Sequence, residues 1–309
     1  MKDKQYRYSE IFGKTIQGEG VYCGQITSWI RFYGCNLECN GFGQLEPTKP
    51  ETYELPYQKI DLTDISNLEQ LPVFPYGCDS SYSWSERYRH LAHLETAEQI
   101  CQKIEDVTKS ESNPDGKFFH PKSKQHIHMA FTGGEPIMSQ HALVDIMRTF
   151  DKRNNTPMYI TIETNGTRPL KKSFVEYFAK EWHGAELFWS VSPKLFNTSG
   201  EKDAICPEVV LSYQNLETQW AGIGCGVGDV SGQLKFVVNG TDESWNDVEQ
   251  AVKQFRDAGV TWPVWIMPVG ATKDEQEEIQ AKVCEQCFER GYNFSARLHN
   301  WVFGNVIGK

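Results

Sequence analysis

The sequence predicts an α/β fold of the β/α-barrel type, and three observations lead to this prediction. From about residue 126 onward, short apolar stretches rich in β-branched and aromatic residues alternate with longer stretches of helical periodicity. Most of the apolar stretches end in a short polar cluster, and in a β/α barrel the carboxyl ends of the strands meet at the active face. The length of 309 residues suits one such domain with an insertion.

The individual elements follow from local patterns. Strands are expected at 27–34, 126–131, 158–163, 187–191, 233–238, 264–268 and 294–299. Helices are expected at 95–110, 139–152, 169–182, 243–258 and 273–290, and the helix 169–182 is expected to begin on Pro169, because proline is favoured in a first turn. The stretch Glu10–Gly20 is expected to be a loop, and residues 40–76, rich in proline and without periodicity, are expected to form a surface insertion.

Composition excludes several function classes. The net charge of −10 argues against a broad nucleic-acid surface, which needs clustered Lys and Arg. No apolar run is long enough to span a bilayer, and the first residues lack the apolar core of a signal peptide, so a cytoplasmic protein is expected. In a reducing compartment, the nine cysteines are expected to be metal ligands or free thiols. A small-molecule substrate is the default expectation.

Three cysteines form the central motif of the chain. Cys35 and Cys39 lie four residues apart after Gly34, and a compact C-x3-C-x2-C run would place a third cysteine at position 42, which is Phe42. The next cysteine is Cys78, beyond the insertion. Three thiolates on a 4Fe-4S cluster leave one iron open, as a catalytic site requires, although spacing alone also allows buried or zinc-binding cysteines.

Other candidate residues lie before and after this motif. Gln17 and Glu19 flank Gly18 in a stretch that allows close approach to a ligand, and Arg31 interrupts an apolar run, where a charge is either paired or directed at an anionic group. The run 132–136, Thr-Gly-Gly-Glu-Pro, ends a predicted strand, and its glycines let the main chain approach a ligand. The histidines and the remaining helical cysteines are interpreted as structural, namely His126, His128, Cys101, Cys284 and Cys287, although the last two are also candidates for a second metal site with Cys206 and Cys225.

Taken together, the motifs Ile16-Gln17-Gly18-Glu19-Gly20, Arg31-Phe32-Tyr33-Gly34-Cys35-Asn36-Leu37 and Cys78-Asp79-Ser80 resemble those of the 7-carboxy-7-deazaguanine synthase family, which belongs to the radical S-adenosylmethionine enzymes. Two departures from the family are visible. The cysteines of the family are compact, whereas here an insertion precedes the third one. The family has Cys-Asp-Thr where this chain has Cys-Asp-Ser.

The resemblance implies a modified partial (β/α) barrel of the radical S-adenosylmethionine type, a homodimer, and an electron donor such as flavodoxin. The implied reaction converts 6-carboxy-5,6,7,8-tetrahydropterin to 7-carboxy-7-deazaguanine by radical ring contraction with loss of ammonia, in queuosine-type 7-deazapurine biosynthesis. The implied cofactors are a 4Fe-4S cluster, S-adenosylmethionine and Mg²⁺. No catalytic side chain is implied beyond the cluster and the cofactor radical.

The resemblance also assigns residues. The 4Fe-4S cluster is assigned to Cys35, Cys39 and Cys78, and Mg²⁺ to Ser80. The pterin is assigned to Ile16, Gln17, Gly18, Glu19, Arg31, Thr132 and His299, with His299 in a closing stretch, Arg297 to Asn305, that resembles the family terminus. The S-adenosylmethionine is assigned to Gly77, Asp79, Gly134, Glu135, Glu163, Ser192, Pro193, Lys194, Lys235, Phe236, Val237 and Val238.

Two alternatives remain open at this point. One is a radical activase of a glycyl-radical partner, against which the Gln17–Gly20 stretch and Arg31 favour a small anionic substrate. The other is a non-catalytic zinc or iron-sulfur interaction protein, in which Cys23 or His90 would complete a closed site around the three cysteines. The later use of the product, in transfer RNA, DNA or a metabolite, has no signal in the sequence.

Overall fold

The computed structural model describes residues 4–217, 229–304 and 306–308, and it confirms the predicted α/β fold. Cys225, a candidate for a second metal site, lies outside the described residues. Within them, nine strands form one sheet in the order β3-β1-β2-β4-β5-β6-β7-β8-β9. The strands are β1 (Gln5–Ile16), β2 (Ile26–Phe32), β3 (His93–Thr96), β4 (His128–Gly133), β5 (Tyr159–Thr164), β6 (Glu186–Val191), β7 (Asp229–Val238), β8 (Val264–Pro268) and β9 (Asn293–Phe294).

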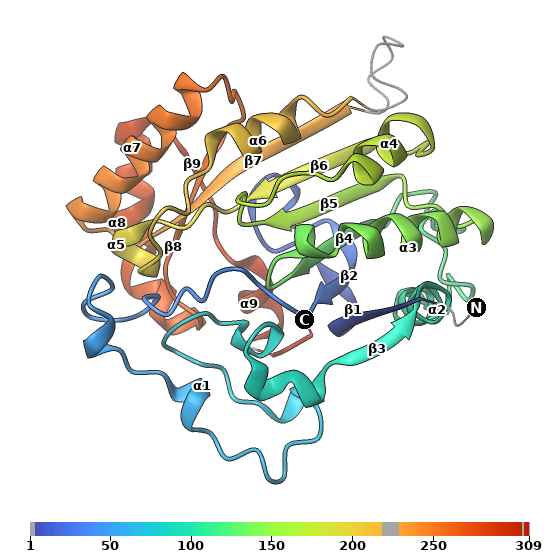
Figure 1. The fold of residues 1–309 in the computed structure, drawn as a ribbon, viewed down its shortest axis with the longest axis horizontal. Helices are drawn as coiled ribbons and strands as arrows, with labels where there is room; N and C mark the ends of the chain where they lie inside the picture. The colour runs from blue at the N-terminus through green and yellow to red at the C-terminus, as the bar shows by residue number, and fades with distance from the viewer. Residues whose placement is uncertain (1–3, 218–228, 305, 309) are drawn as a thin grey trace.

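Strand direction divides the sheet into two parts. The strand β1 is antiparallel to both of its neighbours, β2 and β3. From β2 to β9 every neighbouring pair is parallel, so the carboxyl ends of these strands lie along one edge. The sheet is curved and open in Figure 1, which is consistent with a partial barrel.

Helices follow most of the strands from β3 onward, and α9 follows the last strand. They are α2 (Ala97–Thr108), α3 (Gln140–Lys152), α4 (Lys172–Lys180), α5 (Phe196–Ser199), α6 (Pro207–Gln214), α7 (Asp242–Asp257), α8 (Lys273–Arg290) and α9 (Leu298–Phe303). Local sequence explains several ends: Thr96 and Gln99 form a capping box on α2, Thr272 and Glu275 form one on α8, and α8 stops at Gly291, whose φ is 69°. Among the described residues, no helix has the length and apolar character needed to cross a membrane.

The main core lies between the sheet and these helices. It includes the fully buried aromatic side chains Phe131, Phe150, Trp182, Trp189 and Trp245. Cys101 and Cys287 are buried in the same core, as expected for structural thiols, whereas Cys284 is half-buried. Apolar area removed from water is the main force that holds helices on a sheet, so this core fixes the strand ends at the site.

The insertion has a core of its own. It contains the short helix α1 (Pro56–Lys59), and in Figure 1 it lies apart from the sheet, below it in the view. Tyr57, Leu68, Leu71 and Phe74 pack with Tyr82, Tyr88 and Leu91 from the segment after Cys78. Ile307, near the carboxyl end of the chain, packs against the same cluster.

Three element predictions were wrong. Residues 5–16 form the long strand β1 rather than entering a loop at Glu10, because the part of β1 from Tyr8 to Ile16 pairs antiparallel with β2. The helix expected to begin on Pro169 begins at Lys172, because the Gln140 side chain bonds the Pro169 carbonyl and the Lys171 N–H and holds them outside the helix. The strand expected at 294–299 ends at Phe294.

After Phe294 the chain turns toward the amino-terminal loop. The Leu298 N–H donates to the carbonyl of Gly18 at 2.9 Å, and the Gly20 N–H donates to Ser295 Oγ at 2.9 Å. The first bond occupies the main-chain N–H of Leu298, and the second holds the Ser295 side chain, so the residues after Ser295 are held against the amino-terminal loop rather than along β8. The helix α9 therefore follows instead of a strand.

Candidate active site

A cavity of about 570 Å³ lies at the carboxyl ends of the parallel strands. Its wall is formed by strand ends β2, β4, β5, β6, β7 and β8, by the cysteine loop, by the insertion and by residues 297–308. Catalytic residues of β/α barrels occupy this end of the strands, so the position agrees with an active site. The volume is large enough for a cofactor together with a small substrate.

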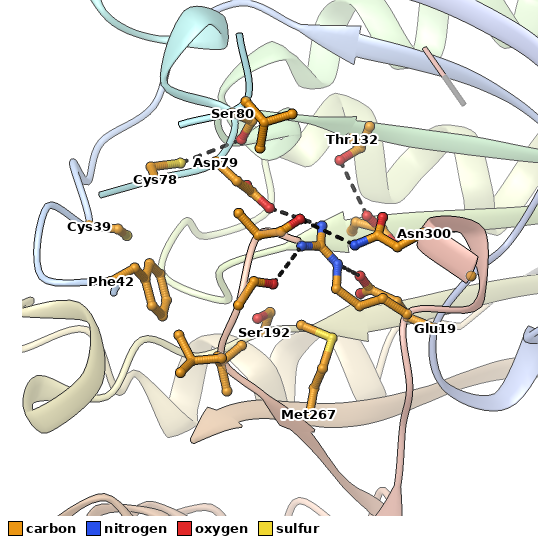
Figure 2. A pocket seen from close by; sticks show the side chains of 18 of the residues that line it. Glu19, Cys39, Phe42, Cys78, Asp79, Ser80, Thr132, Ser192, Met267 and Asn300 are labelled. Atoms are coloured by element: carbon orange, nitrogen blue, oxygen red, sulfur yellow. Dashed lines mark hydrogen bonds and ion pairs between the residues drawn. The ribbon is translucent and has the colours of Figure 1, made fainter. Parts of the chain in front are cut away.

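All three cysteines of the motif line this cavity, although 38 residues separate Cys39 from Cys78. Figure 2 shows Cys39 and Cys78 on the same side of the cavity, with Phe42 beside Cys39. The Gly34 N–H donates to the carbonyl of Ser83 at 2.7 Å, which ties the first cysteine loop to the segment after Cys78. The fold thus brings together thiols that the sequence separates.

Gly134, the second glycine of the Gly-Gly-Glu-Pro run, packs against the cysteine loop. A Cβ on Gly134 would lie 2.5 Å from the Gly34 carbonyl oxygen and 2.7 Å from the Cys35 Cβ, so no larger residue fits there without a shift. The Glu135 N–H also donates to the Gly34 carbonyl at 2.9 Å. Gly134 is therefore required for close packing of two loops, in addition to lining the cavity.

Burial dominates the protonation of the three thiols. It raises the pKa of Cys35 to about 12, and it also raises the pKa values of Cys39 and Cys78. Within the described residues, no group of three or more His, Cys, Asp or Glu side chains is arranged to hold a single metal ion. Cys23 and His90, the candidates for a fourth ligand, are both exposed, and neither lines the cavity.

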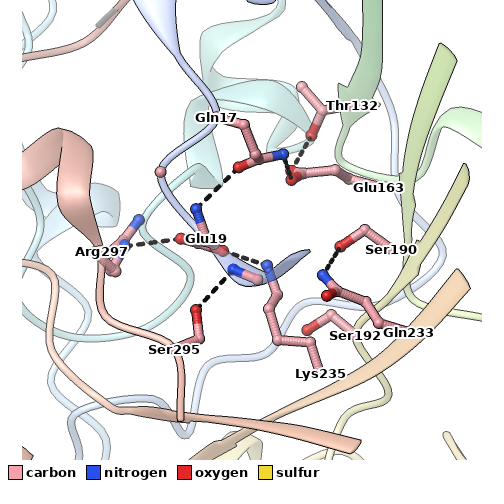
Figure 3. Close-up of polar contacts among 12 residues, drawn as sticks. Gln17, Glu19, Thr132, Glu163, Ser190, Ser192, Gln233, Lys235, Ser295 and Arg297 are labelled. Atoms are coloured by element: carbon pink, nitrogen blue, oxygen red, sulfur yellow. Dashed lines mark hydrogen bonds and ion pairs between the residues drawn. The ribbon is translucent and has the colours of Figure 1, made fainter. Parts of the chain in front are cut away.

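Glu19 is the centre of a charged network in the cavity, shown in Figure 3. It forms ion pairs with Lys235 and, at 3.1 Å, with Arg297 Nε. Burial alone would raise the pKa of Glu19, but the charges of Lys235 and Arg297 hold it well below its usual range. Nearby, Gln17 Nε2 donates to Glu163 Oε1 at 3.1 Å, and Thr132 Oγ1 lies 3.4 Å from Glu163 Oε2.

Arg31 is held at the cavity wall by strand register. Glu10 on β1 pairs with Arg31 on β2, and Arg31 pairs with Thr132 on β4. Arg31 Nε donates to Glu10 Oε1 at 2.6 Å, and its guanidinium lies 5.9 Å from the Tyr82 ring centre. The two terminal nitrogens donate to no acceptor among the described residues, so they are available to an anion in the cavity.

The residues assigned to S-adenosylmethionine divide into two groups. The group that lines the cavity consists of Gly77, Asp79, Gly134, Glu163, Ser192, Lys194, Lys235 and Val237. The group that does not line it consists of Glu135, Pro193, Phe236 and Val238. On β7, Phe236 and Val238 are fully buried in the core, because successive side chains of a strand point to opposite faces.

Glu135 lies behind the cavity wall and is fully buried. Its carboxylate accepts hydrogen bonds from the Ile137 N–H at 2.9 Å, from Thr164 Oγ1 at 2.7 Å and from the Asn165 N–H at 2.7 Å. It therefore ties the loop after β4 to the loop after β5. In this position the side chain supports the wall of the cavity rather than facing into it.

All residues assigned to the pterin line the cavity, and so does Ser80. His299 lies directly against the amino-terminal loop, because a Cβ on Gly18 would come within 1.8 Å of its Nδ1. Burial lowers the pKa of His299 to about 4, so the ring is neutral near pH 7 and offers one donor and one acceptor. Asn305, at the end of the same closing stretch, lies outside the described residues.

Several cavity residues were not predicted from the sequence. Arg297 donates to Asp79 Oδ2 at 2.9 Å and to the Gly270 carbonyl at 3.2 Å, besides its ion pair with Glu19. The insertion contributes Phe42 and Tyr76 to the wall. The signal for Arg297 in the sequence is its positive charge two residues before His299. Phe42 and Tyr76 follow no sequence pattern that predicts a place in the cavity wall.

No protein-family model matches the chain. It is 24% identical over 304 residues to a Halobacterium salinarum protein named 7-carboxy-7-deazaguanine synthase, a match that covers 94% of this chain and 88% of that protein. Proteins of the same name from Pyrobaculum aerophilum and Rhodopirellula baltica are 23% and 22% identical, over 98% and 94% of this chain and 97% and 84% of their own lengths. The chain is therefore similar along almost its whole length to proteins named 7-carboxy-7-deazaguanine synthase, as its motifs predicted.

Proposed function

We propose that the protein is a 7-carboxy-7-deazaguanine synthase, which converts 6-carboxy-5,6,7,8-tetrahydropterin to 7-carboxy-7-deazaguanine with loss of ammonia. The observation that carries the proposal is that Cys35 and Cys39, the distant Cys78 and a set of polar groups line one cavity. The names of the similar proteins support the same activity. The product would serve queuosine-type 7-deazapurine synthesis.

The donor set fits a 4Fe-4S cluster. Cys35, Cys39 and Cys78 would each ligate one iron and leave the fourth open to the amino and carboxylate groups of S-adenosylmethionine. With that cofactor, the cluster supplies the radical chemistry of the reaction. The protein side chains would hold and orient the reactants, and no side chain is assigned a covalent role.

The cofactor would lie along the strand ends that follow the cysteine loop. Gly134, Glu163 and Ser192 line this part of the cavity, and Lys194 Nζ donates to Ser192 Oγ at 3.0 Å. Lys194 also lies over the Phe42 ring, 5.7 Å from its centre. The phenyl ring thus occupies space beside Cys39 and limits the positions open to the cofactor.

The pterin would bind between Arg31 and the Glu19 network. The free terminal nitrogens of Arg31 suit the substrate carboxylate in a bidentate arrangement. Glu19 accepts hydrogen bonds, and Gln17 and neutral His299 each offer a donor and an acceptor. Together they match the hydrogen-bond donors and acceptors along the edge of a pterin ring. Arg31, Glu19 and Gln17 are each held by hydrogen bonds or ion pairs within the protein.

Magnesium would bind at Ser80. Its hydroxyl oxygen suits a hard cation, and the side chain lines the cavity next to Asp79. We further propose that the enzyme is a cytoplasmic homodimer that receives electrons from a flavodoxin-type donor. The magnesium site, the homodimer and the electron donor rest on the resemblance to the family, whereas the cytoplasmic location rests on the lack of a long apolar run and of a signal-peptide core in the sequence.

Anaerobic turnover tests the proposed function. The cluster is reconstituted and reduced, S-adenosylmethionine and 6-carboxytetrahydropterin are added, and 7-carboxy-7-deazaguanine is measured by mass spectrometry. Product is expected from the wild type and from the control Cys206→Ala, whose thiol lies outside the cavity, but not from Cys78→Ala. Cofactor cleavage without this product would overturn the assigned substrate, and a wild type that binds no iron would overturn the radical assignment.

A further inference from the structure

The loop that carries Cys39 rests on a carboxylate from a distant part of the chain. Glu201 Oε1 accepts hydrogen bonds from the Glu38 N–H at 2.9 Å and from the Cys39 N–H at 2.6 Å. Two successive main-chain N–H groups that converge on one acceptor form an anion-binding concavity. Here the anion is supplied by the chain itself, from the segment just after α5.

Close packing reinforces this contact. The Gly41 N–H donates to the Ser199 carbonyl at 2.9 Å, and a Cβ on Gly41 would lie 2.6 Å from backbone atoms of Ser199 and Gly200. Ser199 Oγ in turn accepts from the Glu201 N–H at 3.2 Å, so the supporting segment is itself fixed. The cysteine loop therefore lies directly on residues 199–201.

The backbone of Cys39 needs such support. Its φ is +52°, in the left-handed region, which is unfavourable for a residue with a Cβ. Such a conformation persists only where its surroundings hold it. The hydrogen bond from the Cys39 N–H to Glu201 acts on the strained residue directly.

The split motif explains why the support comes from elsewhere. In a compact spacing the third thiol would follow at position 42, and a loop of two residues would fix the second and third ligands relative to each other. Here that position is Phe42, and Cys78 follows only after the insertion. A connection of this length does not fix the position of Cys78 relative to Cys39 unless other contacts do so.

We propose that Glu201 is a positioning residue, which holds Cys39 in the orientation needed for cluster binding and places a negative charge beside the cluster. Holding Cys39 in place would slow the loss of the cluster, because groups that orient a metal ligand increase the affinity of the protein for the metal. The negative charge lowers the reduction potential of the cluster, because an adjacent negative charge favours its more oxidised form. This inference rests on the proposed role of Cys39 as a ligand.

The test compares Glu201→Ala and Glu201→Gln with the control Glu208→Gln, which removes an exposed carboxylate on α6. In the iron-free proteins, amide hydrogen exchange of residues 38–41 is expected to be faster in Glu201→Ala than in wild type or control. After reconstitution, iron loss to a chelator is expected to be about tenfold faster in Glu201→Ala. Glu201→Gln, which keeps an acceptor, is expected to lose iron more slowly than Glu201→Ala.

The cluster potential separates positioning from simple stability. Glu201→Gln has nearly the same shape as the wild type but no charge, so its cluster midpoint potential is expected to rise while Glu208→Gln leaves it unchanged. Wild-type iron loss and wild-type amide exchange in Glu201→Ala would overturn the positioning role, and an unchanged potential in Glu201→Gln would overturn the charge effect. If the wild type binds no iron, the proposed function fails instead, and amide exchange still tests the contact.

Discussion

Arg297 and Glu19 form an ion pair across the cavity, 3.1 Å between Nε and Oε1, although 278 residues separate them in the sequence. Lys235 holds the same carboxylate from β7. Glu19 thus joins the loop after β1, the strand β7 and the segment between β9 and α9. Its charge balances two buried cations, and this balance can be tested.

Glu19→Gln is expected to lower the free energy of unfolding by about 3 kcal/mol, because it leaves Lys235 and Arg297 as neighbouring like charges without their shared partner. Chemical denaturation of the two proteins measures the difference. The control is Asp257→Asn, which removes an exposed pair with Lys253 and should change stability by less than about 1 kcal/mol. Equal effects of the two substitutions would contradict the buried charge balance.

Arg31→Ala is expected to weaken pterin binding roughly 10- to 100-fold, since hydrogen bonds to a charged group contribute about 1.5–3 kcal/mol. Cleavage of S-adenosylmethionine without pterin should remain, because Arg31 is assigned to the substrate. Arg148→Ala, which removes an exposed pair with Glu181, is the matched control. The measurement is the substrate KM together with direct pterin binding, and an unaltered affinity in Arg31→Ala would count against the assignment.

Ser80→Ala is expected to abolish stimulation by magnesium while cofactor cleavage continues, because the hydroxyl that would bind the cation is lost. Ser80→Thr should restore the stimulation, since it keeps the hydroxyl. Ser212→Ala, on the exposed side of α6, should behave as the wild type. Product formation is measured as a function of magnesium concentration. An unchanged magnesium dependence in Ser80→Ala would contradict the assignment of magnesium to Ser80.

His128 is expected to make stability depend on pH. Burial, and then the charge of His126, lowers the pKa of His128 to about 4 from its ordinary value of 6.5, and the ring stacks on Tyr159. The unfolded chain therefore binds a proton at a higher pH than the folded chain does. The resulting stability is complete above pH 6.5 and is lost as pH falls toward 4.

The wild type should lose about 2 kcal/mol more stability than His128→Gln when pH is lowered from about 7.5 to about 5. Comparing the two proteins removes the contributions of other groups that titrate in this range, such as His299. Denaturant unfolding at the two pH values is the measurement. Parallel pH profiles for both proteins would show that the ring of His128 is not buried in its neutral form.

The sequence predicted elements whose pattern is local and strong. The helix 273–290 and the strand 264–268 were predicted with the bounds that the structure has, and in the structure the helix begins after a capping box of Thr272 and Glu275 and ends before Gly291. The strand β1 was not predicted, because Glu10 and Lys14 interrupt its apolar pattern. Glu10 fits in a strand because it pairs with Arg31 on the neighbouring strand β2. Pairing partners of this kind are set by the fold.

The same limit applies to the site. Cys78 was recognised by the residues that follow it, and the structure brings it to the cavity with Cys35 and Cys39. Glu201 carries no local signal, and Arg297 carries only its position near His299, because each acts on groups more than 160 residues away. The insertion core was also beyond prediction, since its apolar side chains follow neither strand nor helix spacing.

The packing of Ile307 on the insertion core has a consequence for protein synthesis. The three thiols precede Arg297, His299 and Ile307 by more than 200 residues, so they emerge from the ribosome earlier, and all three of these later residues line the cavity. A nascent chain that has reached β8 therefore lacks part of the cavity wall. Any group bound by the thiols would be enclosed only after Arg297, His299 and Ile307 have been synthesised and have packed in place.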